Sequence, residues 1–179
     1  MDDFSIPNTP NLFGLLPSPY NYPAPGKRPL SSTVPTIIER SDGSVFIAVG
    51  GAGGSRIFGA VMHVLMGVLG FSPWEDNKLN IAQAIDAPRL HDQLGVYDFV
   101  DADVHIDPLV VKGLKARGHN VTVADDFNRV AGVVSGVVVR EDGTITGEPF
   151  ATVCRQEWWI YIIPSASSDS RKHGLAAGY

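Results

Sequence analysis

The sequence predicts an α+β domain or a layered α/β domain, because strands and helices follow one another in mixed order and hairpins are present. Two strand-like runs, residues 36–40 and 45–49, flank an Asp42-Gly43 turn that is typical of a β-hairpin. From Ile57 to Leu69 the apolar residues recur at helical spacing, and Gly70 is suited to end that helix. The length of 179 residues fits one domain.

The remaining elements follow from local signals along the chain. Ser55 is expected to cap the first helix. Asp107 and Pro108 supply an N-cap and an N1 proline for a later helix, which Gly118 ends. The other predicted elements are a helix over 77–87 and strands over 96–100, 121–123 and 133–139, with a turn at 141–143.

Two segments do not fit this pattern of strands and helices. Residues 7–29 contain seven prolines, which oppose helix formation and ladder pairing, yet they also contain many apolar side chains. We expect an ordered loop that packs these side chains down, and long loops of this kind are often functional lids. Residues 147–166 combine two tryptophans with an Ile-Tyr-Ile-Ile run and are predicted to be an atypical insert.

Charge and cysteine content exclude several classes of function. Fourteen basic and 19 acidic residues give a net charge of −5, and no basic run indicates nucleic-acid binding. Cys154 is the single cysteine and cannot form an internal disulfide, and the five histidines lack metal-site spacing. We expect no metal and no cofactor. The N-terminal MDDFSIP has no signal-peptide pattern, and the longest apolar stretch, residues 57–71, is short for a membrane span of roughly 20 residues.

The most distinctive local feature is the stretch Gly50-Gly-Ala-Gly-Gly54 between a predicted strand and a predicted helix. Backbone N–H groups at a helix N-terminus suit an anion, either a bound phosphate or a developing oxyanion. The spacing is not the dinucleotide GxGxxG fingerprint, and no GK[ST] follows to make a P-loop. The alternative is a tight strand-to-helix turn that needs positive φ angles, and the residues alone leave both readings open.

Two pairs of polar residues are weaker candidates for binding. The hydroxyls of Ser31 and Ser32, at the end of the proline-rich loop, could donate to a carboxylate or could cap a turn. Asp2 and Asp3 are adjacent acids near the N-terminus, where such residues are usually solvated charge. Composition and spacing alone therefore indicate an α/β-type domain with one turn that is suited to an anion.

Several short motifs occur together in a fixed order. The most specific pair is PGKRPLSS, residues 25–32, followed by GGAGGSRI, residues 50–57. The others are MDDFS (1–5), PSP (17–19), APRLH (87–91), SDSRK (168–172) and AGY (177–179). In these motifs the sequence resembles the C-terminal part of the small subunit of γ-glutamyltranspeptidase, also called glutathione hydrolase, and in particular its fungal members. The resemblance covers residues 1–146 and 167–179.

The resemblance implies a fold and a reaction. The fold is a partial αββα sandwich of the N-terminal nucleophile hydrolase type, built in the family by a large and a small subunit. In that family a precursor cleaves itself, and the new N-terminal threonine attacks γ-glutamyl amides such as glutathione. A γ-glutamyl-enzyme intermediate forms, and water or an acceptor amino acid resolves it. The implied partners are γ-glutamyl compounds and the large subunit of the same precursor.

The resemblance also implies roles for particular residues. Asp3 matches the acid that binds the substrate α-amino group, which is a charge-assisted interaction. Ser31 and Ser32 match the pair that holds the substrate α-carboxylate. Gly53 and Gly54 match the pair whose N–H groups form the oxyanion hole. Residues 7–29 match a lid over the glutamyl pocket.

The sequence also departs from the family pattern in two ways. The nucleophilic threonine lies upstream of MDDFS in the family, so residues 1–179 are expected to form one partial domain that is inactive alone. Residues 147–166 have no counterpart in the motif pattern. Two functions are therefore considered: the substrate-binding portion of a γ-glutamyltransferase, or a non-catalytic remnant or mis-predicted fragment. The family implies a secreted, vacuolar or membrane-anchored location, in which the Asn120-Val-Thr sequon would be a glycosylation site.

Overall fold

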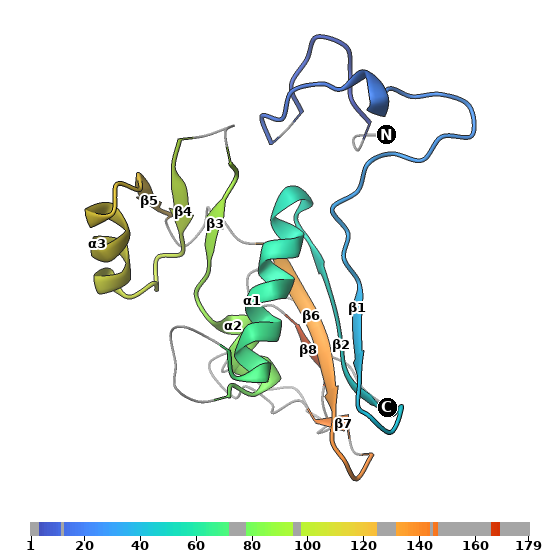
Figure 1. Cartoon of the computed structure of the whole chain (residues 1–179), viewed down its shortest axis with the longest axis vertical. Helices are drawn as coiled ribbons and strands as arrows, with labels where there is room; N and C mark the ends of the chain where they lie inside the picture. The colour runs from blue at the N-terminus through green and yellow to red at the C-terminus, as the bar shows by residue number, and fades with distance from the viewer. Residues whose placement is uncertain are drawn as a thin grey trace, which may run out of the picture.

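The computed structural model describes residues 4–11, 13–71, 78–94, 98–124, 132–143, 145–146 and 166–168. Within this part of the chain, the larger sheet is antiparallel, with the order β1-β2-β6-β7, and β8 also pairs with β6 (Figure 1). In the register, Thr36 is opposite Val49 and Ile47 is opposite Val138. The strands are β1 (Thr36–Glu39), β2 (Val45–Ala52), β6 (Val133–Val139), β7 (Ile145–Thr146) and β8 (Ala166–Ser168).

Two helices, α1 (Ile57–Leu69) and α2 (Ile81–Asp86), cover one face of this sheet. Val64 from α1 and Ile85 from α2 are fully buried against Ile47 and Val134 of the sheet. Apolar burial of this kind supplies most of the free energy that holds a helix on a sheet. Along the middle of β2, buried residues alternate with partly exposed ones, which is the pattern of a strand that is covered on one side.

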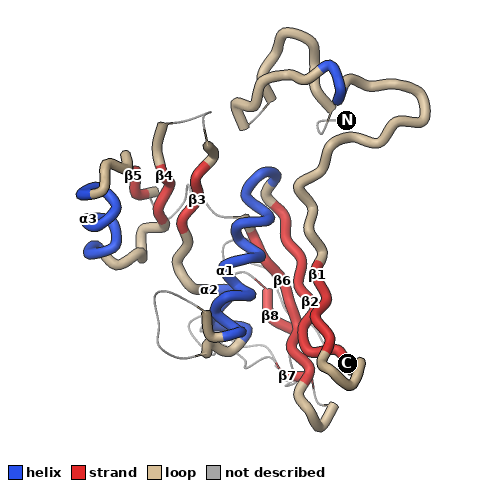
Figure 2. Tube along the Cα trace, viewed as in Figure 1, coloured by secondary structure: helices blue, strands red, loops and turns tan. Residues whose placement is uncertain are grey.

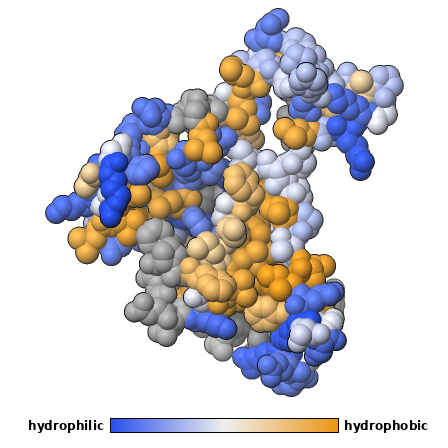
Figure 3. Space-filling view, viewed as in Figure 1, coloured by the Kyte–Doolittle hydropathy of each residue, from blue (hydrophilic) through white to orange (hydrophobic). Residues whose placement is uncertain are grey.

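The outer side of α1 is also apolar. Phe58 and Met62 lie one turn apart and are 59% and 57% exposed. Figure 3 shows apolar side chains gathered over the middle of this face of the molecule. A continuous exposed apolar surface is typical of a place where another part of a protein packs.

A smaller sheet stands beside the helices and contains β3 (Leu90–Asp92), β4 (Val100–Ala102) and β5 (Val121–Val123). β3 and β4 are antiparallel, whereas β4 and β5 are parallel and are connected through α3 (Pro108–Ala116) (Figure 2). A parallel pair requires such a crossover. Among the described residues, no helix is long and apolar enough to cross a membrane.

Most elements lie where the sequence predicts them. The hairpin, α1, its left-handed C-cap at Gly70, β5 and β6 are confirmed, and the Asp107 side chain caps α3 by accepting from the Leu109 N–H at 2.8 Å. The Ser55 cap is wrong, since α1 has Arg56 at its N-cap position and receives no side-chain cap there.

Two further predictions need correction. α2 begins only at Ile81, because Asn80 and Gln83 form a reciprocal capping box that fixes its start. The strand predicted at 96–100 begins at Val100, and residues 95–97 lie outside the described part. β3 was not predicted from the sequence.

The proline-rich segment, residues 7–29, is a loop interrupted by the 3-10 turn η1 (Pro19–Asn21). The expectation that it packs its apolar side chains down is only partly correct. Phe13 and Leu15 are half-buried, whereas Leu16 and Tyr20 are 80% and 91% exposed. The atypical segment 147–166 lies outside the described residues except for Ala166, which begins β8.

Candidate active site

The glycine turn, residues 50–54, forms the end of β2 and the connection to α1. Gly53 and Gly54 adopt φ angles of +132° and +62°. Side chains rarely tolerate positive φ, so glycine is favoured at both positions, as the sequence predicted. The chain then passes through η2 (Gly54–Arg56), a single 3-10 turn, into α1.

The N–H groups of Gly53 and Gly54 stand at the start of α1, and no acceptor among the described residues takes either of them. In the same part of the chain, neither η2 nor α1 receives a side-chain cap. Unpaired backbone donors and the positive end of a helix dipole both favour a negative charge. The turn therefore has the chemistry of an anion site or an oxyanion hole.

Close backbone packing fixes the rear of the glycine turn. A Cβ on Gly53 would stand 2.9 Å from the Cα of Gly132, and one on Gly132 would stand 2.8 Å from the carbonyl oxygen of Arg56. These distances are shorter than those that real Cβ atoms show. Gly132 directly precedes β6, so it connects the turn to the larger sheet.

Arg89, between α2 and β3, supports Gly132 from behind and is only 2% exposed. Its Nη1 atom donates to the carbonyl oxygen of Gly132 at 2.6 Å, and its Nη2 atom donates to the carbonyl oxygen of Ile85. A guanidinium is tolerated in an interior where its N–H groups meet acceptors. No sequence pattern predicts a role for Arg89, because arginine is usually exposed and the residue stands out only as part of the APRLH motif.

Ser31 and Ser32 are both exposed and lie just before β1. The Ser31 hydroxyl donates to Thr33 Oγ1 at 2.9 Å and accepts from the Thr33 N–H at 3.1 Å, so it forms a local turn. Because Thr36 pairs with Val49, the residues before β1 and the residues after β2 leave the same end of the sheet. The structure thus brings the serines and the glycine turn to one end of the sheet, with no recorded bond between them.

Asp3 lies outside the described residues, but Ser5 close to it is well connected. The Ser5 N–H donates to the Asn21 carbonyl oxygen at 3.0 Å, and Asn21 Nδ2 donates to Ser5 Oγ at 3.4 Å. Asn21 Oδ1 in turn accepts from the Leu30 N–H at 2.9 Å. Asn21 therefore holds together the two ends of the loop that separates the MDDFS motif from the serine pair.

The proline-rich loop also contacts the glycine turn directly. The ring of Phe13 lies so close to Gly54 that a Cβ there would stand 2.0 Å from the ring's Cζ atom. The half-buried Phe13 thus covers one side of the turn.

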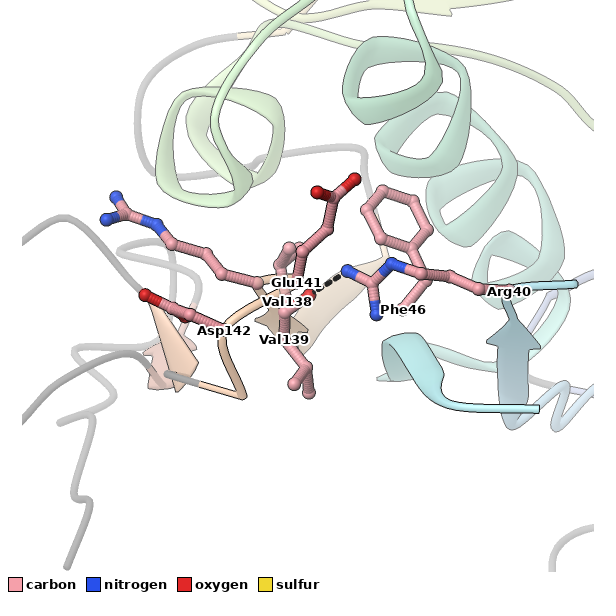
Figure 4. Close-up of a pocket in the computed structure, with 7 residues that line it drawn as sticks. Arg40, Phe46, Val138, Val139, Glu141 and Asp142 are labelled. Atoms are coloured by element: carbon pink, nitrogen blue, oxygen red, sulfur yellow. Dashed lines mark hydrogen bonds between the residues drawn. The ribbon is translucent and has the colours of Figure 1, made fainter. Parts of the chain in front are cut away.

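A shallow hollow of about 480 Å³ lies at the opposite end of the larger sheet (Figure 4). Arg40 lies in it, with its guanidinium 5.1 Å from the centre of the Phe46 ring and bonded to the carbonyl oxygen of Val139. Those contacts hold strand ends together, and none of the residues predicted to carry chemistry lines the hollow. Among the described residues, no cluster of three His, Cys, Asp or Glu side chains could hold a metal.

Comparison with known proteins identifies the family of the chain. A family model described as gamma-glutamyltranspeptidase matches residues 1–179. The chain belongs to the gamma-glutamyltranspeptidase family. The resemblance carried by the short motifs is therefore confirmed.

Two curated relatives illustrate the similarity. The glutathione hydrolase proenzyme of Arthroderma benhamiae is 47% identical over 122 residues, which are 68% of this chain and 20% of the relative. Glutathione hydrolase proenzyme 1 of Schizosaccharomyces pombe is 36% identical over 182 residues, covering 100% of this chain and 24% of the relative. The chain thus spans about a fifth to a quarter of the length of these gamma-glutamyltranspeptidase relatives.

Solved structures agree on the fold. The gamma-glutamyltranspeptidase of Pseudomonas nitroreducens complexed with L-DON matches with a TM-score of 0.72 and 30% identity, over 99% of this chain and 78% of that chain. An acivicin-inhibited gamma-glutamyltranspeptidase matches with a TM-score of 0.70 and 31% identity, over 97% of this chain and 79% of that chain. The predicted α+β fold of the N-terminal nucleophile hydrolase type is confirmed.

Proposed function

We propose that this chain is the substrate-binding portion of a γ-glutamyltransferase or glutathione hydrolase. The observation that carries the proposal is the glycine turn, with two positive-φ glycines and two N–H groups that no described acceptor takes. Membership of the gamma-glutamyltranspeptidase family supports it.

In the proposed reaction, the N–H groups of Gly53 and Gly54 donate to the carbonyl oxygen on which negative charge develops during acyl transfer. A threonine hydroxyl attacks the γ-carbonyl carbon, and the hydroxyl proton passes to the amino group of the same threonine. The carbonyl oxygen becomes negative and accepts from the two glycine N–H groups. The C–N bond then breaks, the leaving amine takes the proton, and a γ-glutamyl ester remains. Removing one such donor costs on the order of 10²–10³ in kcat.

The α-amino and α-carboxylate groups of the glutamyl moiety are proposed to bind at Asp3 and at the Ser31–Ser32 pair. An ammonium facing a carboxylate forms a charge-assisted hydrogen bond, and serine hydroxyls donate to a carboxylate. Both serines are exposed, and the Ser31 hydroxyl has to turn away from Thr33 Oγ1 to donate to a ligand. Residues 7–29 are proposed to be a lid, since Phe13 already lies against Gly54.

The proposed partners are a γ-glutamyl compound such as glutathione and the large subunit of the same precursor. The exposed apolar side of α1, which carries Phe58 and Met62, is consistent with further protein packing there. The small share of each relative that the chain spans also supports a larger assembly.

A hybrid proenzyme tests the proposal. The 179-residue chain replaces the region of the Schizosaccharomyces pombe proenzyme 1 with which it aligns over its whole length. We expect the hybrid to release p-nitroaniline from γ-glutamyl-p-nitroanilide, whereas the chain alone does not. If the hybrid folds and is inactive while the unmodified S. pombe proenzyme is active, the chain is a non-catalytic remnant.

A further inference from the structure

The smaller sheet and the residue that follows its strand β3 contact the segment that leads from the glycine turn into α1. Two consecutive residues of η2 each form one side-chain contact there. Ser55 Oγ donates at 2.8 Å to Oε1 of Gln93, the residue directly after β3. Arg56 Nη2 lies 3.1 Å from Asp101 Oδ2 on β4.

One contact comes from Gln93, directly after β3, and the other comes from Asp101 on β4, the strand that pairs with β3. His91 on β3 is opposite Asp101 on β4 in the antiparallel register. His91 is 9% exposed, and its Nε2 lies 2.6 Å from the same Gln93 oxygen that accepts from Ser55. A carbonyl oxygen has two lone pairs and cannot donate, so with this amide orientation His91 is the donor and the oxygen of Gln93 is fully used. The hydrogen bond from His91 thereby fixes the Gln93 side chain in the orientation in which it accepts from Ser55.

The glycine turn needs contacts from other segments, because its own residues provide few interactions that hold its backbone in place. Gly53 and Gly54 have no side chains, and glycine is the residue with the greatest backbone freedom. No described side chain caps η2 or α1. Misplacement of a catalytic group by about 1 Å costs on the order of 10²-fold in rate.

We propose that Gln93 is a positioning residue, which holds Ser55 and thereby fixes the direction of the Gly53 and Gly54 N–H groups. The inference rests on the proposed function, since it assumes that those groups meet the oxyanion. Gln93 does not touch the substrate. Its loss should therefore lower kcat and leave KM nearly unchanged.

Three variants of the hybrid proenzyme test this role. Gln93→Leu removes the acceptor and keeps the bulk, and we expect kcat to fall five- to tenfold with KM within twofold. Gln93→Glu restores an oxygen that accepts from both Ser55 and His91, and it should recover most of the lost kcat. Ser55→Ala should lower kcat to the same extent, and adding it to Gln93→Leu should cause little further loss, because both act through one bond.

Gln83→Leu is the matched control. Gln83 Oε1 is likewise a side-chain acceptor, taking a hydrogen bond from the Asn80 N–H at 3.0 Å, but it caps α2 away from the turn. This variant should lose thermal stability and keep kcat. If Gln93→Leu lowers kcat no more than Gln83→Leu does, the positioning role is wrong.

The outcomes also separate the inference from the proposed function. If Gly54→Pro, which removes the backbone N–H, abolishes turnover and Gln93→Leu leaves kcat within twofold, only the positioning role fails. If an active hybrid tolerates Gly54→Pro as well, the oxyanion proposal itself fails.

Hydrogen exchange on the 179-residue chain gives a readout that needs no activity. The Arg56 and Ile57 N–H groups donate to the Gly53 and Gly54 carbonyl oxygens. Gln93→Leu should raise their exchange rates about tenfold relative to Gln83→Leu. Equal rates in the two variants would overturn the inference.

Discussion

The aromatic ring of Phe13 lies against Gly54, so that a Cβ on Gly54 would stand 2.0 Å from the ring's Cζ atom. This contact joins the proline-rich loop to the glycine turn, although the two residues belong to segments that differ in structure and in composition. It gives Gly54 two separate reasons to be glycine, since its φ angle of +62° is also unfavourable for any side chain.

The contact predicts a strong effect of Gly54→Ala in the hybrid proenzyme. The added methyl group must displace Phe13 and must also accept a backbone conformation that costs about 1–2 kcal/mol for a non-glycine residue. We expect kcat for γ-glutamyl-p-nitroanilide to fall at least tenfold.

Gly50→Ala is the control for this substitution. Gly50 lies in the same turn, but no described atom stands within 4 Å of a Cβ there, and its φ angle is not in the positive range. Steady-state kinetics of both variants should show a large loss for Gly54→Ala only. Similar kcat values in the two variants would contradict the close packing of Phe13 on Gly54.

The serine pair should affect substrate binding rather than the chemical step. Ser31→Ala and Ser32→Ala each remove a hydroxyl that is proposed to donate to the α-carboxylate of the substrate. Such a contact is made in the ground state and in the transition state, so KM should rise more than kcat falls. A KM increase of about tenfold corresponds to roughly 1.4 kcal/mol.

Thr33→Val distinguishes binding of the α-carboxylate by Ser31 from the part that Ser31 plays in the local turn. It removes the hydroxyl that accepts from Ser31 at 2.9 Å but leaves the Ser31 hydroxyl in place. If Thr33→Val raises KM as much as Ser31→Ala does, the serine acts through the turn and not on the carboxylate.

Asn21 is predicted to keep the two halves of the glutamyl-binding region in register. Asn21→Ala removes the Oδ1 atom that accepts from the Leu30 N–H and the Nδ2 atom that donates to Ser5. We expect KM to rise several-fold with a smaller change in kcat. Asn80→Ala, which removes a capping asparagine at α2, should lower the melting temperature and leave KM unchanged.

The extent to which the sequence predicted these features follows from how local their causes are. The positive φ angles of the glycine turn and the cap of α3 by Asp107 depend on neighbouring residues, and both are confirmed. The Ser55 cap is wrong because Ser55 lies inside the 3-10 turn η2, which leaves Arg56 at the N-cap of α1, and its hydroxyl donates instead to Gln93. The side-chain bond joins residues 38 positions apart, and no sequence period indicates such a pair.

Arg89 illustrates the same limit in the site itself. Arginine side chains are usually exposed, so the sequence predicts an exposed residue here. Arg89 is buried instead, because the fold brings together the carbonyl acceptors of Ile85 and Gly132. The position of Ser31 and Gly54 at one end of the sheet follows from the β1–β2 register. In contrast to the burial of Arg89, that register is a consequence of the hairpin turn.

His63 on α1 predicts how stability depends on pH. Burial, and to a lesser extent the nearby Arg89 guanidinium, lowers the pKa of His63 below the ordinary value of 6.5. Its Nδ1 atom is buried and has no partner among the described residues. As the pH falls through 6.5, the unfolded chain binds a proton on this histidine before the folded chain does. The free energy of unfolding should therefore be largest above about pH 7 and should decrease towards the lowered folded-state pKa.

Thermal unfolding of the 179-residue chain between pH 7.5 and 5.5 measures this dependence, with His63→Gln and His119→Gln as matched variants. His119 is exposed, so its substitution should leave the pH dependence of the parent intact. His63→Gln removes the titrating group, and the decrease in melting temperature between the two pH values should become smaller. If the decrease is the same in both variants, protonation of His63 is not coupled to folding, and the partly buried position of its ring near Arg89 does not persist in solution.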